Sequence, residues 1–318
     1  MSTRPFYILA CDGGGVRGKA TVKFLYEFTK YMKTKDPNFK LYDFFDMYAG
    51  TSVGALIILM ISACKYDEDK LMEVFNDHLC REIMDKSVWD KLVGLIQHKP
   101  KYDGEGKRKA ITKHLGDIKL SEIDKYVVIP TYNITEQRTQ IFHSDQINET
   151  VLCREIADAT SAAPAYFPSV KITNCNNKNQ KCKEGWFIDG GVVANNPTIC
   201  AIAKAKRLLK NQNRKIVVLN IGTGHKTRYL NGEEAQGYGG IEWLLHNIIG
   251  ITMDETVINE QATDLLANHH YININGNLDY VSDDIDDCSD ENLENLEKMG
   301  LQWWNENKSK FENFLELH

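Results

Sequence analysis

The sequence predicts an α/β protein, a three-layer α/β/α sandwich built around a central, largely parallel sheet. Short apolar runs, typical of strands buried on both faces, alternate with segments whose apolar residues recur at helical spacing. Two of these runs end in glycine-containing turns that lead into a helix, at residues 12–18 and 50–54. The 318 residues contain no convincing linker. We therefore expect one domain, 1–318, with its core motifs in 5–225 and a C-terminal helical part, 226–318, packed on them.

The individual strands and helices follow from the same apolar patterns. Residues 6–11 form an apolar run that stops at consecutive glycines, and residues 44–49 form another that stops at Gly50, so each is expected to be a buried strand. Further strands are expected at 126–132, 139–142, 186–188 and 215–221. Helices are expected at 16–31, 53–63, 67–80, 107–115, 151–160, 197–210 and 290–314. The last of these carries an apolar stripe, which predicts a face packed on the core: Leu293, Leu296, Met299 and Trp303.

Charge and composition exclude some classes of function. The formal net charge of −6 argues against a nucleic-acid binder, because affinity for nucleic acid is built from Lys and Arg on phosphates. The start of the chain lacks the pattern of a secretory signal, and the longest apolar run, 53–64, is shorter than the roughly 20 residues that span a bilayer. We therefore expect a cytoplasmic protein without a transmembrane anchor, which can lie peripherally on membranes.

The cysteines carry a weaker signal. Most of the eight lie in apolar stretches, so we expect buried, reduced thiols. Cys175 and Cys182 bracket a polar loop, 174–184, that is expected to be an exposed insertion. These two residues could pair as a disulfide or share a metal, and their spacing leaves both alternatives open.

Ser52 lies in the segment Gly50-Thr51-Ser52-Val53-Gly54, between an expected strand and an expected helix. A serine nucleophile on a tight strand-to-helix turn needs neighbours without a Cβ at plus and minus two, so that strand and helix can approach. The spacing of Gly50 and Gly54 satisfies that need. Ser52 is therefore the candidate nucleophile.

The segment 12–18, Asp-Gly-Gly-Gly-Val-Arg-Gly, can bind an anion through its backbone N–H groups. A dinucleotide fingerprint would need an acidic residue about 20 positions on at a strand end, and Asp36 lies in an expected loop. A P-loop would need Ser or Thr where Ala20 stands. The third interpretation is an oxyanion hole made by Gly13, Gly14 and Gly15, with Arg17 as a further candidate or as a surface ion pair.

The base is expected at the end of the strand 186–188, where Asp189 precedes two glycines. A carboxylate at the end of a strand in an α/β sheet is well placed for catalysis, although Asp-Gly is also a common turn. Asp189 can act alone on Ser52, or with a histidine in the order Ser, Asp, His. His225 satisfies that order, and His269 and His270 are weaker candidates. The residues alone leave the dyad and the triad both open.

On these residues the chain resembles the patatin-like phospholipases. The loop 12–18, the elbow 50–54 and the segment 189–191 match that family's three catalytic motifs. Similar segments also stand at 101–104, 127–131, 161–168, 195–197, 221–224 and 291–296. The resemblance implies a patatin-like fold, a Ser52–Asp189 dyad without a catalytic histidine, and no metal or other cofactor. It also implies cleavage of fatty-acyl esters in phospholipids and galactolipids through an acyl-enzyme, with 161–168 shaping the acyl channel.

Two other functional hypotheses remain beside this one. The chain could be an effector, defence or storage protein of the same fold, in which lipid binding or partner-controlled activity dominates. A nucleotide-binding protein using Gly13 to Gly18 is the remote alternative. One basic cluster could meet anionic lipid at a membrane or micelle surface, or could be a solvated face. Its members are Lys99, Lys101, Lys107, Arg108, Lys109 and Lys113.

Overall fold

The computed structural model describes residues 4–84, 99–145, 150–173, 185–226, 232–239, 255–266 and 270–315. These residues form an eight-stranded sheet in the order β5-β6-β3-β2-β1-β7-β8, with β4 paired to β3 off this path. The strands are β1 (Phe6–Cys11), β2 (Met47–Gly50), β3 (Tyr126–Asn133), β4 (Arg138–His143), β5 (Val170–Ile172), β6 (Gly185–Ile188), β7 (Ile216–Ile221) and β8 (Tyr271–Ile274). The pairings of β1 with β2 and β7, of β2 with β3 and of β7 with β8 are parallel. The expected largely parallel sheet is confirmed, with antiparallel β4, β5 and β6 added at one end.

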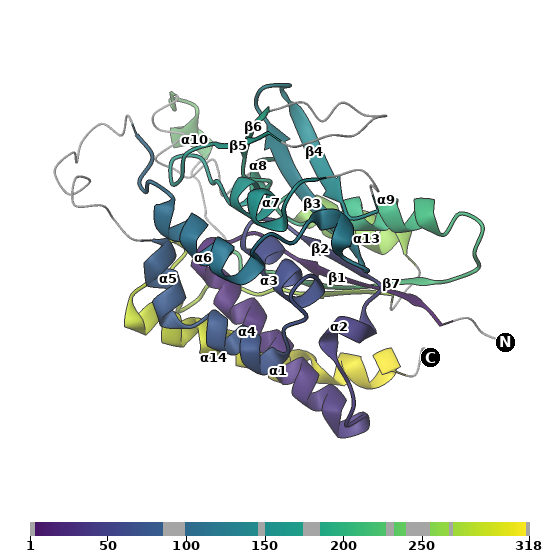
Figure 1. Ribbon diagram of the computed structural model, residues 1–318. Helices are drawn as coiled ribbons and strands as arrows, with labels where there is room; N and C mark the ends of the chain where they lie inside the picture. The colour runs from purple at the N-terminus through teal and green to yellow at the C-terminus, as the bar shows by residue number, and fades with distance from the viewer. Residues whose placement is uncertain are drawn as a thin grey trace.

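Helices cover both faces of this sheet (Figure 1). Along β1, Tyr7 and Leu9 belong to one buried cluster, whereas Phe6 and Ile8 belong to another, as alternation in a strand requires. The larger cluster lies under α1 (Gly18–Lys35), α3 (Val53–Ser62) and α14 (Asp290–Leu315). The smaller cluster lies under α9 (Thr198–Leu208) and α13 (Thr256–Leu265). This arrangement confirms the three-layer prediction.

The C-terminal helix packs along the first helix. The ring of Phe24 on α1 lies 5.7 Å from that of Trp304 and 5.9 Å from that of Phe311. Lys19 Nζ, at the start of α1, lies 2.9 Å from Glu297 Oε1. The apolar stripe expected on this helix is buried in the core, as predicted. The C-terminal helix is therefore held on α1 by packed aromatic rings and an ion pair.

Several boundaries differ from the sequence prediction. The expected strand 44–49 begins only at Met47, because α2 (Leu41–Phe44) precedes it. The expected helix 67–80 is divided into α4 (Glu68–Val74) and α5 (Asp77–Ile83). The division falls at Asn76, whose side-chain oxygen accepts the N–H of Leu79 at 3.1 Å and so begins a new helix. The C-terminal part, expected to be helical, also supplies β8 beside β7.

The remaining described elements are short. They are η1 (Gly15–Arg17), α6 (Glu105–Leu115), η3 (Leu120–Glu122), α7 (Cys153–Thr160), α8 (Gly191–Ala194) and α10 (Gly232–Ala235). Within the described ranges, no helix has both the length and the apolar character needed to cross a membrane.

Candidate active site

Ser52 occupies a strained turn between β2 and α3. Its φ of 54° and ψ of −123° lie in a region that side chains other than glycine rarely adopt. A Cβ on Gly50 would lie 2.5 Å from the Gly54 carbonyl oxygen, and one on Gly54 would lie 2.1 Å from the Cys11 carbonyl oxygen. The two glycines therefore have the role that their spacing predicted. They let β2, α3 and the end of β1 approach closely enough to hold the serine.

Asp189 reaches Ser52 because β2 and β6 share one edge of β3. β4 pairs with β3 along residues 128–133, so β2 and β6 must use the opposite edge. There β2 pairs parallel up to Val128, and β6 pairs antiparallel at Tyr132 and Asn133. The carboxyl ends of β2 and β6 therefore point toward each other. Asp189 directly follows the end of β6, and Ser52 stands two positions after the end of β2.

The two side chains contact each other directly. Ser52 Oγ donates to Asp189 Oδ2 at 2.8 Å, and the Gly191 N–H donates to Asp189 Oδ1 at 2.6 Å. The backbone N–H of Asp189 donates to the Ala162 carbonyl at 3.0 Å. Both carboxylate oxygens are thus held, and no further residue stands between Ser52 and Asp189.

The pKa of the Asp189 carboxyl is shifted toward neutral pH. Only 5% of the residue is exposed, and burial raises the pKa of Asp189 from its ordinary value of 3.8 to about 6. The hydrogen bonds from Gly191 and Ser52 and the positive charge of Lys107 act in the opposite direction. An aspartate with a pKa near 6 is a stronger base than an exposed one and is still ionised at pH 7.

The glycine loop lies beside Ser52, but its three glycines are not equivalent. The Gly13 N–H donates to the Asn195 carbonyl at 3.1 Å, so this amide is already bonded, contrary to the expectation that it serves an oxyanion. Gly14 and Gly15 line the same cavity as Ser52. A Cβ on Gly14 would lie 2.1 Å from Thr223 Oγ1, which shows how closely the loop is packed from behind.

Arg17 supports this loop from within the protein. Its side chain is buried, and its Nε donates to the Gly14 carbonyl at 3.3 Å. The residue is not among those that line the cavity. The expected alternative of a surface ion pair is therefore wrong, and a direct contact with the reacting oxygen is not supported. The guanidinium fixes the loop that carries the amides of Gly14 and Gly15.

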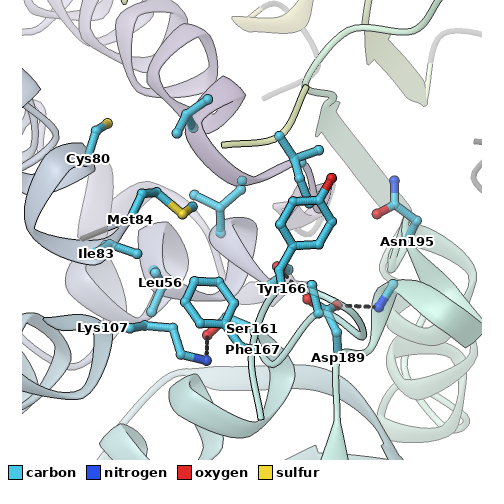
Figure 2. A pocket seen from close by; sticks show the side chains of 18 of the residues that line it. Leu56, Cys80, Ile83, Met84, Lys107, Ser161, Tyr166, Phe167, Asp189 and Asn195 are labelled. Atoms are coloured by element: carbon cyan, nitrogen blue, oxygen red, sulfur yellow. Dashed lines mark hydrogen bonds between the residues drawn. The ribbon is translucent and has the colours of Figure 1, made fainter. Parts of the chain in front are cut away.

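A cavity of about 330 Å³ adjoins Ser52 and Asp189. Figure 2 shows Leu56, Ile83 and Met84 on one side of it and Tyr166 and Asp189 on the other. The segment 161–168, for which the resemblance implies a place at the acyl channel, contributes to the wall of this cavity through Ala163, Pro164, Tyr166 and Phe167. The volume and apolar lining suit a hydrocarbon chain.

The sequence did not predict the wall contributed by α5 and the loop before α14. Leu79 and Cys80 on α5 face the cavity, and Ile285 faces it from the loop before α14, where it stands between Asp284 and Asp286. The apolar residues of 67–80 were a signal, but their spacing also fits ordinary core packing. Ile285 is a single apolar residue among acidic ones, and nothing in its neighbourhood indicates a cavity.

Two of the three histidines considered as triad members lie outside the cavity. His225 is exposed, and its backbone exchanges hydrogen bonds with Gly276 and Leu278. His270 is buried beside β7, where its carbonyl accepts the Val218 N–H. Neither residue lines the cavity. His269, Cys175 and Cys182 lie outside the described residues.

The expected basic cluster does not form a single charged surface. Lys107 is only 2% exposed and points into the protein, whereas Lys109 is exposed. Lys101 is ion-paired with Asp286. Within the described ranges, no group of three or more His, Cys, Asp or Glu side chains is arranged to hold a metal ion.

Comparison with known proteins points to one family. The family model described as Patatin-like phospholipase matches residues 9–202. Patatin-like protein 2 of Oryza sativa subsp. indica is 29% identical over 346 residues, covering 95% of this chain and 84% of that protein. Patatin-like protein 2 of Arabidopsis thaliana is 34% identical over 268 residues, covering 76% of this chain and 65% of that protein. The cGAMP-activated phospholipase of Escherichia coli (strain TW11681) is 28% identical over 325 residues, covering 93% and 87%.

Proposed function

This chain belongs to the patatin-like phospholipase family, a family of lipid acyl hydrolases, and from that premise we propose how it cleaves its substrate. Ser52 is the nucleophile and Asp189 is the base, and the reaction splits fatty-acyl esters of phospholipids and galactolipids. The observation that carries this proposal is the 2.8 Å hydrogen bond from Ser52 Oγ to Asp189 Oδ2 beside an apolar cavity. An acyl chain in that cavity would bring its ester carbonyl to Ser52.

The first step forms an acyl-enzyme. Asp189 accepts the hydroxyl proton as Ser52 Oγ attacks the ester carbonyl carbon, and the carbonyl oxygen becomes an oxyanion. We assign its stabilisation to the N–H groups of Gly14 and Gly15, since the Gly13 N–H is bonded to Asn195. The carbon–oxygen bond to the lipid alcohol then breaks, and the alcohol leaves with the proton held by Asp189.

The second step releases the fatty acid. Asp189, again a carboxylate, takes a proton from water while that water attacks the acyl carbon. The ester bond to Ser52 breaks, and the proton returns from Asp189 to Ser52 Oγ. Asp189 takes part in every proton transfer, and its partner is Ser52, the leaving alcohol or water in turn. We propose that the reaction takes place at a membrane or micelle surface and in the cytoplasm.

Direct product analysis tests this function. The purified protein, incubated with vesicles that contain phospholipids and galactolipids, is expected to release free fatty acids and lysolipids, identified by mass spectrometry. Ser52→Ala should release none while unfolding at a temperature close to that of the unaltered protein. Intact lipids after incubation with the unaltered protein would refute the proposal.

His225→Ala serves as the control that separates the dyad from the triad. Because His225 is exposed and outside the cavity, its removal is expected to leave the rate of fatty-acid release nearly unchanged. A loss as deep as that of Ser52→Ala would show that a histidine takes part in the reaction.

The rate of ester hydrolysis is expected to rise with pH through about pH 6, because only the carboxylate form of Asp189 can accept the serine proton. Below that pH, kcat/KM should fall about tenfold per unit, as for a single essential base. The measurement is a pH profile with a soluble short-chain ester, which avoids changes in the lipid surface. A profile with its half-maximum near the ordinary value of 3.8 would contradict the effect of burial on this carboxyl.

A further inference from the structure

Lys107 is a buried lysine whose contacts all lead toward the candidate active site. It belongs to α6, and only 2% of its surface is exposed. Its Nζ donates to the Asp158 carbonyl at 2.9 Å and to Ser161 Oγ at 3.2 Å, the second of which is drawn in Figure 2. It also lies 3.0 Å from Asp158 Oδ1 as an ion pair. A buried ammonium is costly unless it is paired in this way.

Protein oxygens surround the ammonium group of Lys107. Two of them accept its hydrogen bonds, and the third, Asp158 Oδ1, lies 3.0 Å away as an ion-pair partner. The fourth neighbour is the ring of Phe167, whose centroid lies 4.6 Å from Nζ. Lys107 lines the cavity, and its Nζ is directed at these protein groups. We therefore expect Lys107 to influence the reaction through the residues that it contacts.

The residues next to those contacts hold the backbone of both candidate catalytic residues. Lys107 anchors the C-terminal end of α7, at Asp158 and Ser161. Between them, Thr160 Oγ1 donates to the Pro130 carbonyl at 2.7 Å and accepts the Ser52 N–H at 3.2 Å. The segment 160–162 is thus a shared support for the two sides of the dyad.

The same segment supports the base. The Ala162 carbonyl accepts the Asp189 N–H at 3.0 Å, and the Thr160 carbonyl accepts the Gly190 N–H at 3.2 Å. An ammonium at the C-terminal end of a helix also satisfies a carbonyl that has no partner within the helix. Loss of the Lys107 contacts would loosen the turn that fixes the distance between Ser52 Oγ and Asp189 Oδ2.

The charge of Lys107 also reaches Asp189. Burial raises the pKa of Asp189, and Lys107 is the charged group that lowers it, beside the hydrogen bonds from Gly191 and Ser52. Lys107 itself faces Asp158 from α7, Asp189 from the end of β6 and Arg108 on its own helix. Burial lowers the pKa of Lys107, and the charge and hydrogen bonding of Asp158 act against that change.

We propose that Lys107 is a positioning residue for the Ser52–Asp189 pair, which holds the turn 160–162 and contributes a buried positive charge that acts on the Asp189 carboxylate. The inference rests on the proposed function, since it concerns the same base. Lys107 thereby has a role different from that of the basic cluster to which its place in the sequence assigned it. Asp158 is its ion-pair partner, and the Asp158 carboxylate would lose that partner if Lys107 were removed.

The test compares pH profiles of kcat/KM for a soluble ester. Lys107→Met alone leaves the Asp158 carboxylate buried without its partner and can prevent folding, so the main variant is Lys107→Met/Asp158→Asn, which removes both charges. Its acid limb is expected to move to higher pH by roughly half a unit to one unit. Lys107→Arg keeps the charge, so the acid limb of its pH profile should lie where it does in the unaltered protein. Lys109→Met removes an exposed lysine of the same helix and should leave the profile unchanged.

A second measurement does not depend on turnover. The Asp189 carboxyl is titrated by isotope-edited infrared spectroscopy in the unaltered protein and in the double variant, and the same upward displacement is expected. The proposal would be overturned if the double variant folds and neither the acid limb of kcat/KM nor the infrared titration of Asp189 changes. Lys107 would then have only a structural role. Absence of ester hydrolysis in the unaltered protein would refute the proposed function instead, and the infrared titration would still decide the case of Lys107.

Discussion

Asp189→Asn is expected to abolish ester hydrolysis and, at the same time, to make the folded protein more stable at neutral pH. The amide cannot accept the serine proton, and a positioned general base contributes about 10²–10⁴ in rate. The packing changes little, because asparagine has the shape of aspartate. Its oxygen can still accept the Gly191 N–H, and its NH₂ group can donate to Ser52 Oγ.

The gain in stability follows from the sign of the pKa change. In the folded protein the pKa of Asp189 is about 6, above the ordinary 3.8, so ionisation is harder in the folded state than in the unfolded one. The folded state therefore loses stability as pH rises from about 4 to about 6. A displacement of about two units corresponds to roughly 3 kcal/mol above that range. Asparagine has no such ionisation and avoids this cost.

Thermal unfolding and ester hydrolysis, measured on the same samples, check the gain in stability and the loss of activity. The melting temperatures of the variant and the unaltered protein should be similar near pH 4 and should separate as the pH approaches 7, with the variant higher. Ser52→Ala is the matched control, since it removes the activity while Asp189 remains ionisable. A variant that melts lower than the unaltered protein at pH 7, or that still hydrolyses esters, would contradict this account of Asp189.

Of the substitutions proposed for this protein, Gly54→Ala is expected to lower the free energy of unfolding the most. The added Cβ would lie 2.1 Å from the Cys11 carbonyl oxygen and 2.7 Å from the Asp12 carbonyl oxygen. Both are main-chain atoms. Cys11 is the last residue of β1, which is paired on both edges with β2 and β7 and cannot move aside, and Asp12 follows it directly. The free energy of unfolding should fall by at least about 3 kcal/mol, the upper range for overpacking.

Urea unfolding measures this loss. Gly232→Ala is the comparison, because nothing lies within 4 Å of its Cβ position, and its free energy of unfolding should stay within about 1 kcal/mol of the original. If Gly54→Ala unfolds at the urea concentration of the unaltered protein, the close approach of α3 to β1 is not what holds the elbow.

The features that the sequence predicted well are those that depend on neighbours in the chain. The turn at Ser52 needs small residues two positions away on each side, and the strand before Asp189 is apolar at every position but its first. The alternation of strands and helices followed from local periodicity. The division of the helix 67–80 was also within reach, because Asn76 is a favourable N-cap residue, although a continuous apolar pattern concealed it.

The features that the sequence did not predict depend on distant partners. Lys107 lies in a run of basic residues, and only the placement of Asp158 opposite it shows that its charge is buried. The Gly13 amide looks the same in sequence as those of Gly14 and Gly15, yet Asn195 binds it. β8 is only four residues long, which is too short to be recognised before β7 is in place beside it.

The backbone conformation of Ser52 has one more consequence. A residue with φ of 54° and ψ of −123° stays there only because β1, β2 and α3 enclose it, so the unfavourable conformation is imposed when the chain folds. The hydroxyl is then preorganised toward Asp189 before any lipid arrives, and little reorganisation is left for each turnover. Sequence changes that relax this turn should therefore give a chain that folds more readily and reacts more slowly, a trade-off between stability and activity at a single residue.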